Sequence, residues 1–517
     1  MILAKIYNYQ SYLEEVAGHG SKRALLDIES GESLTYERLV ELSFQVGRLL
    51  RSSSIKPGER VMLIGVRGLD WAPIFFGTQL AGVVAVPVDT RASDALIQSV
   101  IEATRPVLII TGGAVRLKTA AKTRPAADFL KEARGLKTPV ELKAAPPSSI
   151  GQILLSSGTW SQPKGVTLRQ GNVLQNMLAA EQVYQVGPSE VLLSILPLSH
   201  AYEQMCGLHI PLRAGCQVVY LDEIEGEKIK AAIKKYGVTL IVAVPRILEM
   251  FQKGILSRLP EEKRPKIVKI AHLLRFKPIF IRRLFFRKVH QGLGPSLRTL
   301  VVGGAALTEE TDRFFQGLGY KILAGYGLSE TAPIISISTR QRGRRIGDVG
   351  RILDNLEVKT NPDGELLVRG PSVFAGYWPE RRSPRAWFET GDLAEIDGRQ
   401  LRLIGRKKDM IVFASGDKVM SEEVEILITQ NFPKIEEAIV MAESGKGGLA
   451  KGLLIAYKAD GDIGERAIKG LLAEHLPKSI RVIGVRNIHP ETLSRTHTLK
   501  LARRNNLDRF KELFTKK

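Results

Sequence analysis

A loop rich in Ser, Thr and Gly carries the residues best suited to chemistry in this 517-residue chain. It spans 156–165 (SSGTWSQPKG) and follows a short apolar run at 153–155. Backbone N–H groups, hydroxyls and one lysine cation offered from such a loop can hold a polyphosphate. Because the Gly-x4-Gly-Lys-Ser/Thr spacing is absent, the loop is not of the Walker A type. It predicts a nucleotide site of another kind.

Further segments with chemically useful residues follow in a fixed order. They are 197–203 (PLSHAYE), 302–306 (VGGAA), 325–331 (GYGLSET), 390–392 (TGD), 405–409 (GRKKD) and 494–500 (SRTHTLK). Together with the loop, this series resembles the adenylate-forming (AMP-binding) superfamily over nearly the whole chain. The PLSHAYE segment and the Thr-Leu-Lys ending resemble the long-chain fatty acyl-CoA synthetase branch.

The resemblance implies a two-step ligase reaction. A long-chain fatty acid would react with ATP to give acyl-AMP, and the acyl group would then pass to CoA. A carboxylate is already ionised at neutral pH, so its attack on the α-phosphate needs no general base. The obstacle is repulsion between anions, which cations and preset N–H donors reduce. Magnesium is the implied metal, and it takes hard oxygen ligands.

The resemblance also implies roles around the triphosphate and adenine. Glu330 and Thr159 are expected to serve the magnesium ion and catalysis. The residues expected to bind the nucleotide in these segments are Ser156, Ser157, Gly158, Thr159, Lys164, Gly304, Ala305, Tyr326, Gly327 and Thr331. Tyr326 would stack on adenine beside the backbone of Gly304 and Ala305.

Other implied roles fall outside the triphosphate and adenine segments. Asp392 would accept hydrogen bonds from both ribose hydroxyls, and Arg406 would reach the same ribose. Lys408 occupies the family's hinge position. Lys500 would bridge the substrate carboxylate and the α-phosphate as the catalytic lysine. His200 is assigned to the catalytic set, in a segment that lines the acyl site in this branch.

Two alternatives to the CoA ligase stay open at this point. Trp160 and Ser161 replace a Thr and a Gly that the family usually carries, so either the loop is rebuilt or catalysis is weak. A non-catalytic nucleotide- or acyl-binding homologue is therefore one alternative. An acyl-adenylating enzyme that loads a carrier protein without CoA is the other. The Asp that binds an α-amino group in peptide-synthetase domains is missing, which argues against an amino-acid substrate.

The formal net charge of +21 makes anionic partners expected. Residues 263–290 hold ten Lys or Arg and no Asp or Glu, interleaved with apolar residues. This segment either rests on anionic lipid or forms a helical hairpin whose apolar side packs on the domain. Nucleic acid is not expected, because no recognised RNA-binding module accompanies the basic residues.

Continuous apolar runs alternate with helical stretches in the first 350 residues. Runs near 61–64, 83–88, 107–110, 191–196, 217–221, 239–244 and 298–302 predict parallel strands covered on both faces. Residues 112–150 read as a loosely constrained connection, and short strands with turns begin near 347.

The predicted fold is α/β. A large N-terminal AMP-binding domain (1–404) contains two α/β sheet subdomains and a small β-barrel-like subdomain. A hinge (405–409) joins it to a smaller, mobile α+β domain (410–517).

The chain shows no N-terminal signal peptide and no run of about 20 apolar residues. Its two cysteines, Cys206 and Cys216, imply no disulfide framework or metal cluster and suit a reducing compartment. We therefore expect a cytoplasmic protein, with peripheral contact at the inner face of the membrane as an added possibility through 263–290.

Overall fold

A computed structural model describes residues 8–488 and Phe514, with internal gaps. The gaps are 90, 114–116, 118, 137–140, 156–164, 340–346, 381–386, 414, 416, 445–448 and 460. The chain forms two compact units. The first contains Met1–Lys359, Leu367–Phe388 and Ile396–Arg402, and the second contains Thr360–Leu366, Glu389–Glu395 and Leu403–Lys517. The mobility of the second unit and the hinge at 405–409 stay predictions.

One large sheet of the first unit contains six parallel strands in the order β13-β12-β11-β9-β10-β1. These strands are β13 (Lys321–Gly327), β12 (Thr299–Val302), β11 (Leu240–Ala243), β9 (Val191–Ser194), β10 (Gln217–Tyr220) and β1 (Arg23–Asp27). Antiparallel strands flank them: β2 (Ser33–Thr35) at β1, and β14 (Ile334–Ser338) followed by β15 (Asp348–Ile352) at β13. The parallel core predicted from the apolar runs is confirmed.

A second sheet of the first unit runs in the order β18-β8-β7-β4-β3-β5-β6. Its strands are β3 (Arg60–Ile64), β4 (Val84–Val88), β5 (Leu108–Thr111), β6 (Lys122–Pro125), β7 (Ile150–Leu155), β8 (Gly165–Arg169) and β18 (Tyr377–Trp378). All residues of β4 are buried, as expected of a strand covered on both faces. Helices α2 (Tyr36–Ser52) and α3 (Gly68–Leu80) pack so closely that a Cβ on Gly77 would lie 2.2 Å from the side chain of Val46.

The interpretation of 112–150 as a loose connection is wrong. The segment contains β6 and helix α5 (Ala126–Gly135), which buries Ala126, Phe129, Leu130 and Ala133. These residues recur at helical spacing, so the helix follows from an amphipathic pattern that the surrounding Lys, Pro and Thr obscure.

Strands from residue 347 onward confirm the predicted β-rich region. They are β15, β16 (Glu357–Thr360), β17 (Glu365–Arg369), β19 (Phe388–Asp397) and β20 (Gln400–Arg406). Within the first unit β15 hydrogen-bonds to β14 of the large sheet and to the first residues of β20. The strands β16, β17, β19 and β20 each contribute residues to both units.

The second unit has its own α+β core. A sheet of β23 (Ile435–Ser444), β24 (Ala450–Ala459) and β25 (Val482–Asn487) packs with α15 (Ser421–Asn431) and α16 (Glu465–His475). Buried Val424, Ile428, Leu453, Ile468 and Leu472 join these elements in one apolar cluster.

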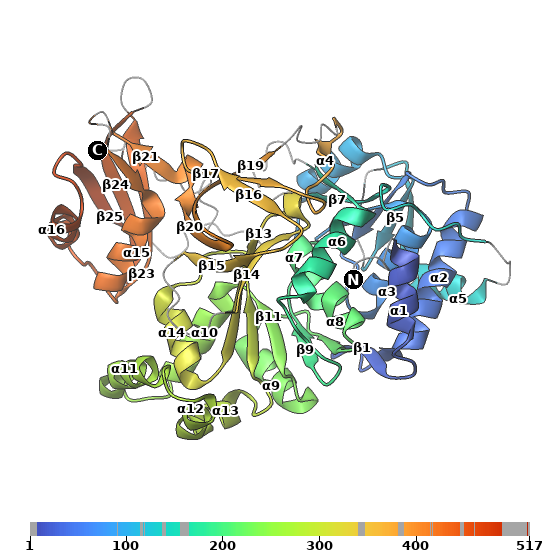
Figure 1. The fold of residues 1–517 in the computed structure, drawn as a ribbon, viewed down its shortest axis with the longest axis horizontal. Helices are drawn as coiled ribbons and strands as arrows, with labels where there is room; N and C mark the ends of the chain where they lie inside the picture. The colour runs from blue at the N-terminus through green and yellow to red at the C-terminus, as the bar shows by residue number, and fades with distance from the viewer. Residues whose placement is uncertain are drawn as a thin grey trace. The chain divides into compact units, whose positions relative to one another are not determined.

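Three short helices stand apart from the sheets of the first unit, beside α14 (Glu309–Leu318), at the lower left of Figure 1. They are α11 (Arg264–Leu274), α12 (Ile279–Phe285) and α13 (Arg287–Leu293). None of the described helices combines the length and the apolar composition needed to cross a bilayer.

Candidate active site

The carboxyl ends of neighbouring parallel strands collect several predicted site segments. Strand β12 leads into Gly304 and Ala305, which are both exposed, and its neighbour β13 ends in Tyr326 and Gly327. Gly304 adopts a φ of +82°, a left-handed conformation that favours glycine. Ligands of α/β proteins bind at this end of the strands, so the fold puts these residues where a nucleotide is expected.

A tight turn holds Glu330 just beyond β13. A Cβ on Gly327 would lie 1.8 Å from the carbonyl oxygen of Pro333, so the turn requires a glycine there. The fully buried Thr331 accepts a hydrogen bond from Leu328 N at 3.2 Å, and its hydroxyl lies 2.7 Å from Pro333 O as a donor. The Thr331 side chain therefore holds the turn, and its predicted contact with nucleotide stays a prediction.

Strand β18 links Glu330 to the predicted phosphate loop. The hydroxyl of Tyr377 donates to Glu330 Oε1 at 2.9 Å. The next residue, Trp378, is paired with Gly165, the last residue of the loop segment, and Gly165 is in turn paired with Leu155, the residue that precedes the segment. Both ends of the loop are thus fixed next to the strand that holds Glu330.

Residues 156–164 of the loop lie outside the described residues. The predictions for Ser156, Ser157, Gly158, Thr159 and Lys164, and the substitutions at Trp160 and Ser161, therefore stay predictions. The catalytic assignment of Lys500 also falls on a residue outside the described part of the chain.

Glu330 has a charge and an oxygen to offer to a cation. Within the described part of the chain it makes no ion pair, and the hydrogen bond that its carboxylate accepts there comes from a neutral phenol. The described residues contain no group of three or more His, Cys, Asp or Glu that could hold a metal by itself. Mg²⁺ bound with phosphates typically uses one or two carboxylates together with phosphate and water oxygens. A single carboxylate at Glu330 fits that requirement.

The PLSHAYE segment follows β9, in the same sheet. His200 is half-buried and precedes helix α7 (Ala201–Glu203). The Tyr202 hydroxyl donates to Val301 O at 3.1 Å, and its ring lies against Gly303, where a Cβ would be 2.9 Å away. The segment that begins with His200 is thus packed against the strand end that leads to Gly304.

Glu203, which the sequence did not single out, is a fully buried carboxyl group. It accepts a hydrogen bond from the Ser194 hydroxyl, and burial raises its pKa to about 8. It precedes a wide π-helical turn (Gln204–His209), and a Cβ on Gly207 would lie 2.4 Å from Glu203 Oε1. Glu203, the last residue of the PLSHAYE segment, is therefore a buried neutral acid that is hydrogen-bonded to Ser194 at the end of β9.

In the second unit, Asp392 and Arg406 form an ion pair. Arg406 Nε lies 2.6 Å from Asp392 Oδ1, and the Asp392 side chain is 4% exposed whereas that of Arg406 is 43% exposed. The two residues predicted to share one ribose therefore lie side by side, and their binding of the ribose stays a prediction.

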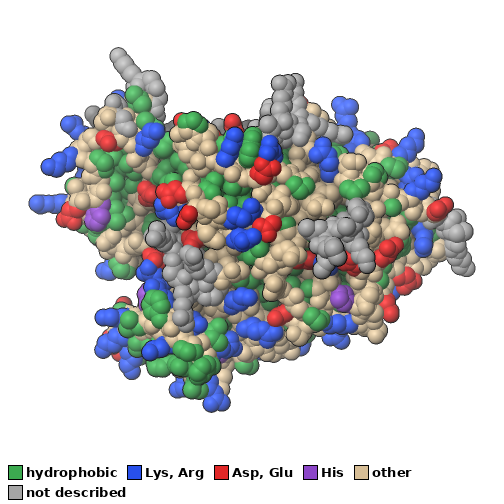
Figure 2. Space-filling model, in the orientation of Figure 1, with side chains coloured by type: hydrophobic (Ala, Val, Ile, Leu, Met, Phe, Trp, Pro, Cys, Tyr) green, Lys and Arg blue, Asp and Glu red, His purple; other side chains and the backbone are tan. Residues whose placement is uncertain are grey.

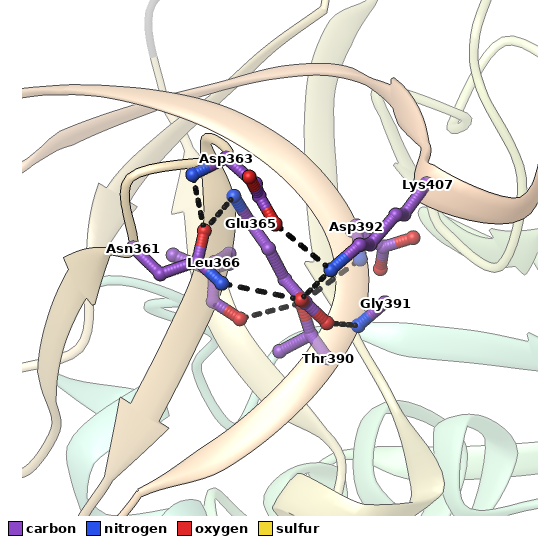
Figure 3. Close-up of polar contacts among 8 residues, drawn as sticks. All are labelled: Asn361, Asp363, Glu365, Leu366, Thr390, Gly391, Asp392 and Lys407. Atoms are coloured by element: carbon purple, nitrogen blue, oxygen red, sulfur yellow. Dashed lines mark hydrogen bonds and ion pairs between the residues drawn. The ribbon is translucent and has the colours of Figure 1, made fainter. Parts of the chain in front are cut away.

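A polar network shapes the strand that carries Asp392 (Figure 3). Thr390 Oγ1 accepts from Asp392 N at 3.1 Å and donates to Leu366 O at 2.8 Å. Glu365 accepts from Gly391 N at 3.1 Å through Oε1 and lies 2.9 Å from Lys407 Nζ through Oε2. These bonds fix the backbone at Asp392.

The predicted hinge lysine, Lys408, directly follows Lys407, which belongs to this network. Lys407 is bound to Glu365 and, at 3.4 Å, to Asp363, and the hydrogen bond with Glu365 raises the Lys407 pKa. Lys408 follows in the same short 3-10 turn (Lys407–Asp409) and is exposed. The hinge role of Lys408 remains a prediction.

Tyr377 is the main residue that sequence reasoning missed. It lies 47 positions from Glu330, in a Gly-Tyr-Trp-Pro stretch (376–379) that has no recognisable chemical motif. The pairing of β18 with β8 and a hydrogen bond from Phe374 N to Glu330 O at 2.9 Å bring the phenol to the carboxylate.

A glycine-rich turn and a metal-competent carboxylate at the carboxyl ends of a parallel sheet define a nucleotide-using α/β enzyme. Comparison with known families makes this class specific. The model of the AMP-binding enzyme family matches residues 13–378, and the chain belongs to that family.

Two curated relatives and one solved structure show the extent of the similarity. The chain is 29% identical to long-chain-fatty-acid–CoA ligase FadD15 of Mycobacterium bovis, covering 76% of this chain and 73% of the relative. It is 24% identical to long-chain-fatty-acid–CoA ligase 4 of Saccharomyces cerevisiae, covering 80% and 71%. The fold matches O-succinylbenzoate coenzyme A synthetase from Bacillus subtilis, in complex with ATP and magnesium, at a TM-score of 0.78 and 20% identity, over 95% and 98% of the chains.

Proposed function

We propose that this chain is an AMP-forming long-chain fatty acid–CoA ligase. A fatty acid carboxylate oxygen attacks the α-phosphorus of ATP, the bond to the β-phosphate bridging oxygen breaks, and pyrophosphate leaves. The CoA thiol sulfur then attacks the acyl carbon, AMP leaves, and the thiol proton is released. The curated relatives carry this activity in their names.

The observation that carries the proposal is the arrangement around β18. Tyr377 holds Glu330, and the adjacent Trp378 is paired with the residue that ends the predicted phosphate loop. A loop with hydroxyls, N–H groups and a lysine, next to a carboxylate with no described counter-charge, suits a metal-bound triphosphate.

Individual residues contribute by binding and orientation. Glu330, together with Thr159, would hold Mg²⁺, and the B. subtilis relative with bound ATP and magnesium supports this choice of metal. When bound, the ion would neutralise part of the triphosphate charge. Lys500 would offset the charge of the approaching carboxylate. Asp392 and Arg406 would orient the ribose.

The acceptor and the setting of the reaction complete the proposal. CoA is preferred to an acyl carrier protein because the named activity of the relatives is CoA ligation. A reorientation of the second unit about 405–409 would separate the two steps. A long-chain substrate partitions into membranes, so peripheral membrane contact through 263–290 would bring the enzyme to its substrate.

A two-stage assay tests the function. Pyrophosphate exchange is measured with acids from acetate to stearate, and thioester formation is measured after CoA is added. Exchange with long-chain acids followed by acyl-CoA formation is expected. Exchange without a thioester would favour the carrier-protein acceptor. No exchange with any acid would favour the non-catalytic homologue and overturn the proposal.

A further inference from the structure

Helix α12 contacts the rest of the domain through charged side chains and exposes its apolar side chains to solvent. Arg282 is buried, with 6% of its surface exposed, and its Nη1 donates to Gln316 O at the end of α14. Arg283 donates to Pro295 O at 2.8 Å and Leu297 O at 3.1 Å. The helix is therefore attached to the domain through arginines. This arrangement rules out, for α12, a hairpin that packs its apolar side inward.

The apolar residues of this region face solvent instead. Of the eleven large hydrophobic residues classed as exposed in the described chain, seven lie between 273 and 285, and they include the six most exposed. They are Leu273 (63%), Phe276 (52%), Ile279 (46%), Phe280 (69%), Ile281 (38%), Leu284 (71%) and Phe285 (57%). Figure 2 shows hydrophobic side chains gathered over this region at the lower left, among Lys and Arg. We call these seven residues the α11–α12 apolar surface. Contiguous exposed apolar patches mark interaction sites.

The helices that carry this surface are packed against the first unit. The fully buried Ala271 of α11 lies against Gly317 of α14, where a Cβ would be 2.0 Å from Ala271 O. His290 hydrogen-bonds to Leu318 O through Nε2 at 2.8 Å, and Phe286 is 5% exposed. The apolar surface is thus presented by helices anchored at both ends, so its exposure is a feature of the packed domain.

The segment that carries this surface is rich in cations, whereas Glu261 and Glu262 directly precede it and Glu310 lies near His272 of α11. Six exposed Lys or Arg lie in 263–290, which contains no Asp or Glu. They are Lys263, Lys266, Lys269, Lys277, Arg287 and Lys288.

We propose that the α11–α12 apolar surface docks onto an anionic lipid bilayer. Apolar side chains would enter the headgroup–acyl boundary while the surrounding cations contact lipid phosphates. A second copy of the chain is a poorer partner, because joining the same surface on two copies would bring like charges together. The surface is independent of the reaction proposed above, and its test uses no substrate.

Vesicle co-sedimentation of the full chain tests the proposal. Vesicles of phosphatidylcholine with 30% phosphatidylglycerol are compared with pure phosphatidylcholine. We expect binding to the anionic vesicles that weakens with salt. The double variant Phe280→Ser/Leu284→Ser should bind at least about 100-fold more weakly, because two largely exposed apolar side chains no longer enter the bilayer. The variant Lys266→Gln/Lys277→Gln/Lys288→Gln should lose roughly 100-fold at low salt, since each cation contributes about fivefold.

Matched controls separate this surface from general charge and apolar effects. Lys122, Lys131 and Lys234 are exposed elsewhere in the first unit, and their triple change to Gln should leave vesicle binding within a few-fold. Ile483→Ser removes an exposed apolar residue (42%) of the second unit and should have no effect. Unchanged thermal midpoints establish that the variants are folded.

Three results would overturn the proposal. The first is a wild-type chain that does not bind anionic vesicles. The second is binding that survives both test variants or is lost equally in the controls. The third is a dimer, seen by sedimentation velocity, that is abolished by Phe280→Ser/Leu284→Ser while vesicle binding is unchanged.

Discussion

The hydrogen bond from Tyr377 to Glu330 offers a sharp test of the site. Tyr377→Phe removes one hydroxyl and keeps the ring, which packs on Phe374 at 4.8 Å. The pairing of β18 with β8 holds the backbone of Tyr377 in place. The hydrogen bond from its phenol therefore fixes the Glu330 carboxylate to a sheet strand. A hydrogen bond to a charged group contributes roughly 1.5–3 kcal/mol. If the bond orients Glu330 toward the metal, its loss corresponds to about a 10- to 150-fold change.

The assay is the magnesium dependence of pyrophosphate exchange. We expect Tyr377→Phe to raise the Mg²⁺ concentration for half-maximal exchange about tenfold or more, while the KM for fatty acid stays within twofold. Tyr236→Phe is the control, because Tyr236 lies under Lys235 at 5.2 Å in a helix remote in sequence from the site. Reduced exchange with an unchanged magnesium dependence would refute the positioning role, since a merely structural loss would lower all rates alike.

Three further outcomes are expected. Asp392→Ala should raise the KM for ATP roughly 10- to 100-fold and reduce the preference for ATP over 2′-deoxy-ATP; an unchanged preference would contradict the ribose assignment. Burial raises the pKa of Glu203 from 4.5 to about 8, so the folded chain keeps a proton that the unfolded chain releases. Stability should therefore fall as pH rises from about 4.5 to 8, by on the order of 3 kcal/mol at pH 7. Glu203→Gln should flatten the thermal midpoint over that interval, and a variant that keeps the wild-type slope would exclude this cause. Lys500→Ala should abolish exchange while leaving Mg·ATP binding by calorimetry; retained exchange would show that another group does its work.

The parallel core could be predicted because its strands are nearly continuous apolar runs. Short runs of this kind that alternate with helical stretches indicate strands covered on both faces, and β4 with its fully buried residues is an example. Helix α5 was missed because its four buried residues are small in number beside the Lys, Thr and Pro around them. The polar composition of the segment suggested a loop, although the apolar residues have the spacing of a helix.

Which face of α12 packs against the protein could not be predicted from the local sequence. Arg282 is buried because Gln316, 34 residues away, presents a carbonyl oxygen at the end of α14. An amphipathic pattern shows that two faces differ, but it does not say which face meets the protein when an arginine can satisfy a helix end.

Some residues of the candidate site could also be predicted from the sequence, and others could not. Motif order predicted that Asp392 and Arg406 act together, and they form an ion pair at 2.6 Å. Tyr377 carries no motif, since its position depends on a strand pairing that joins segments more than 200 residues apart in the chain. Residues in contiguous motifs could be found from sequence, whereas residues that support them through the sheet required the structure.

We propose that Glu330 serves the ATP-dependent activation of a long-chain acid. Pyrophosphate exchange with palmitate, measured for the wild-type chain and for Glu330→Gln, tests it most directly. The substitution keeps the side-chain volume and an oxygen that can accept from Tyr377, but it removes the charge offered to Mg²⁺. We predict palmitate-dependent exchange in the wild type and a loss of roughly 100-fold or more in Glu330→Gln. Wild-type exchange that does not depend on the fatty acid, or equal exchange in both proteins, would contradict the account.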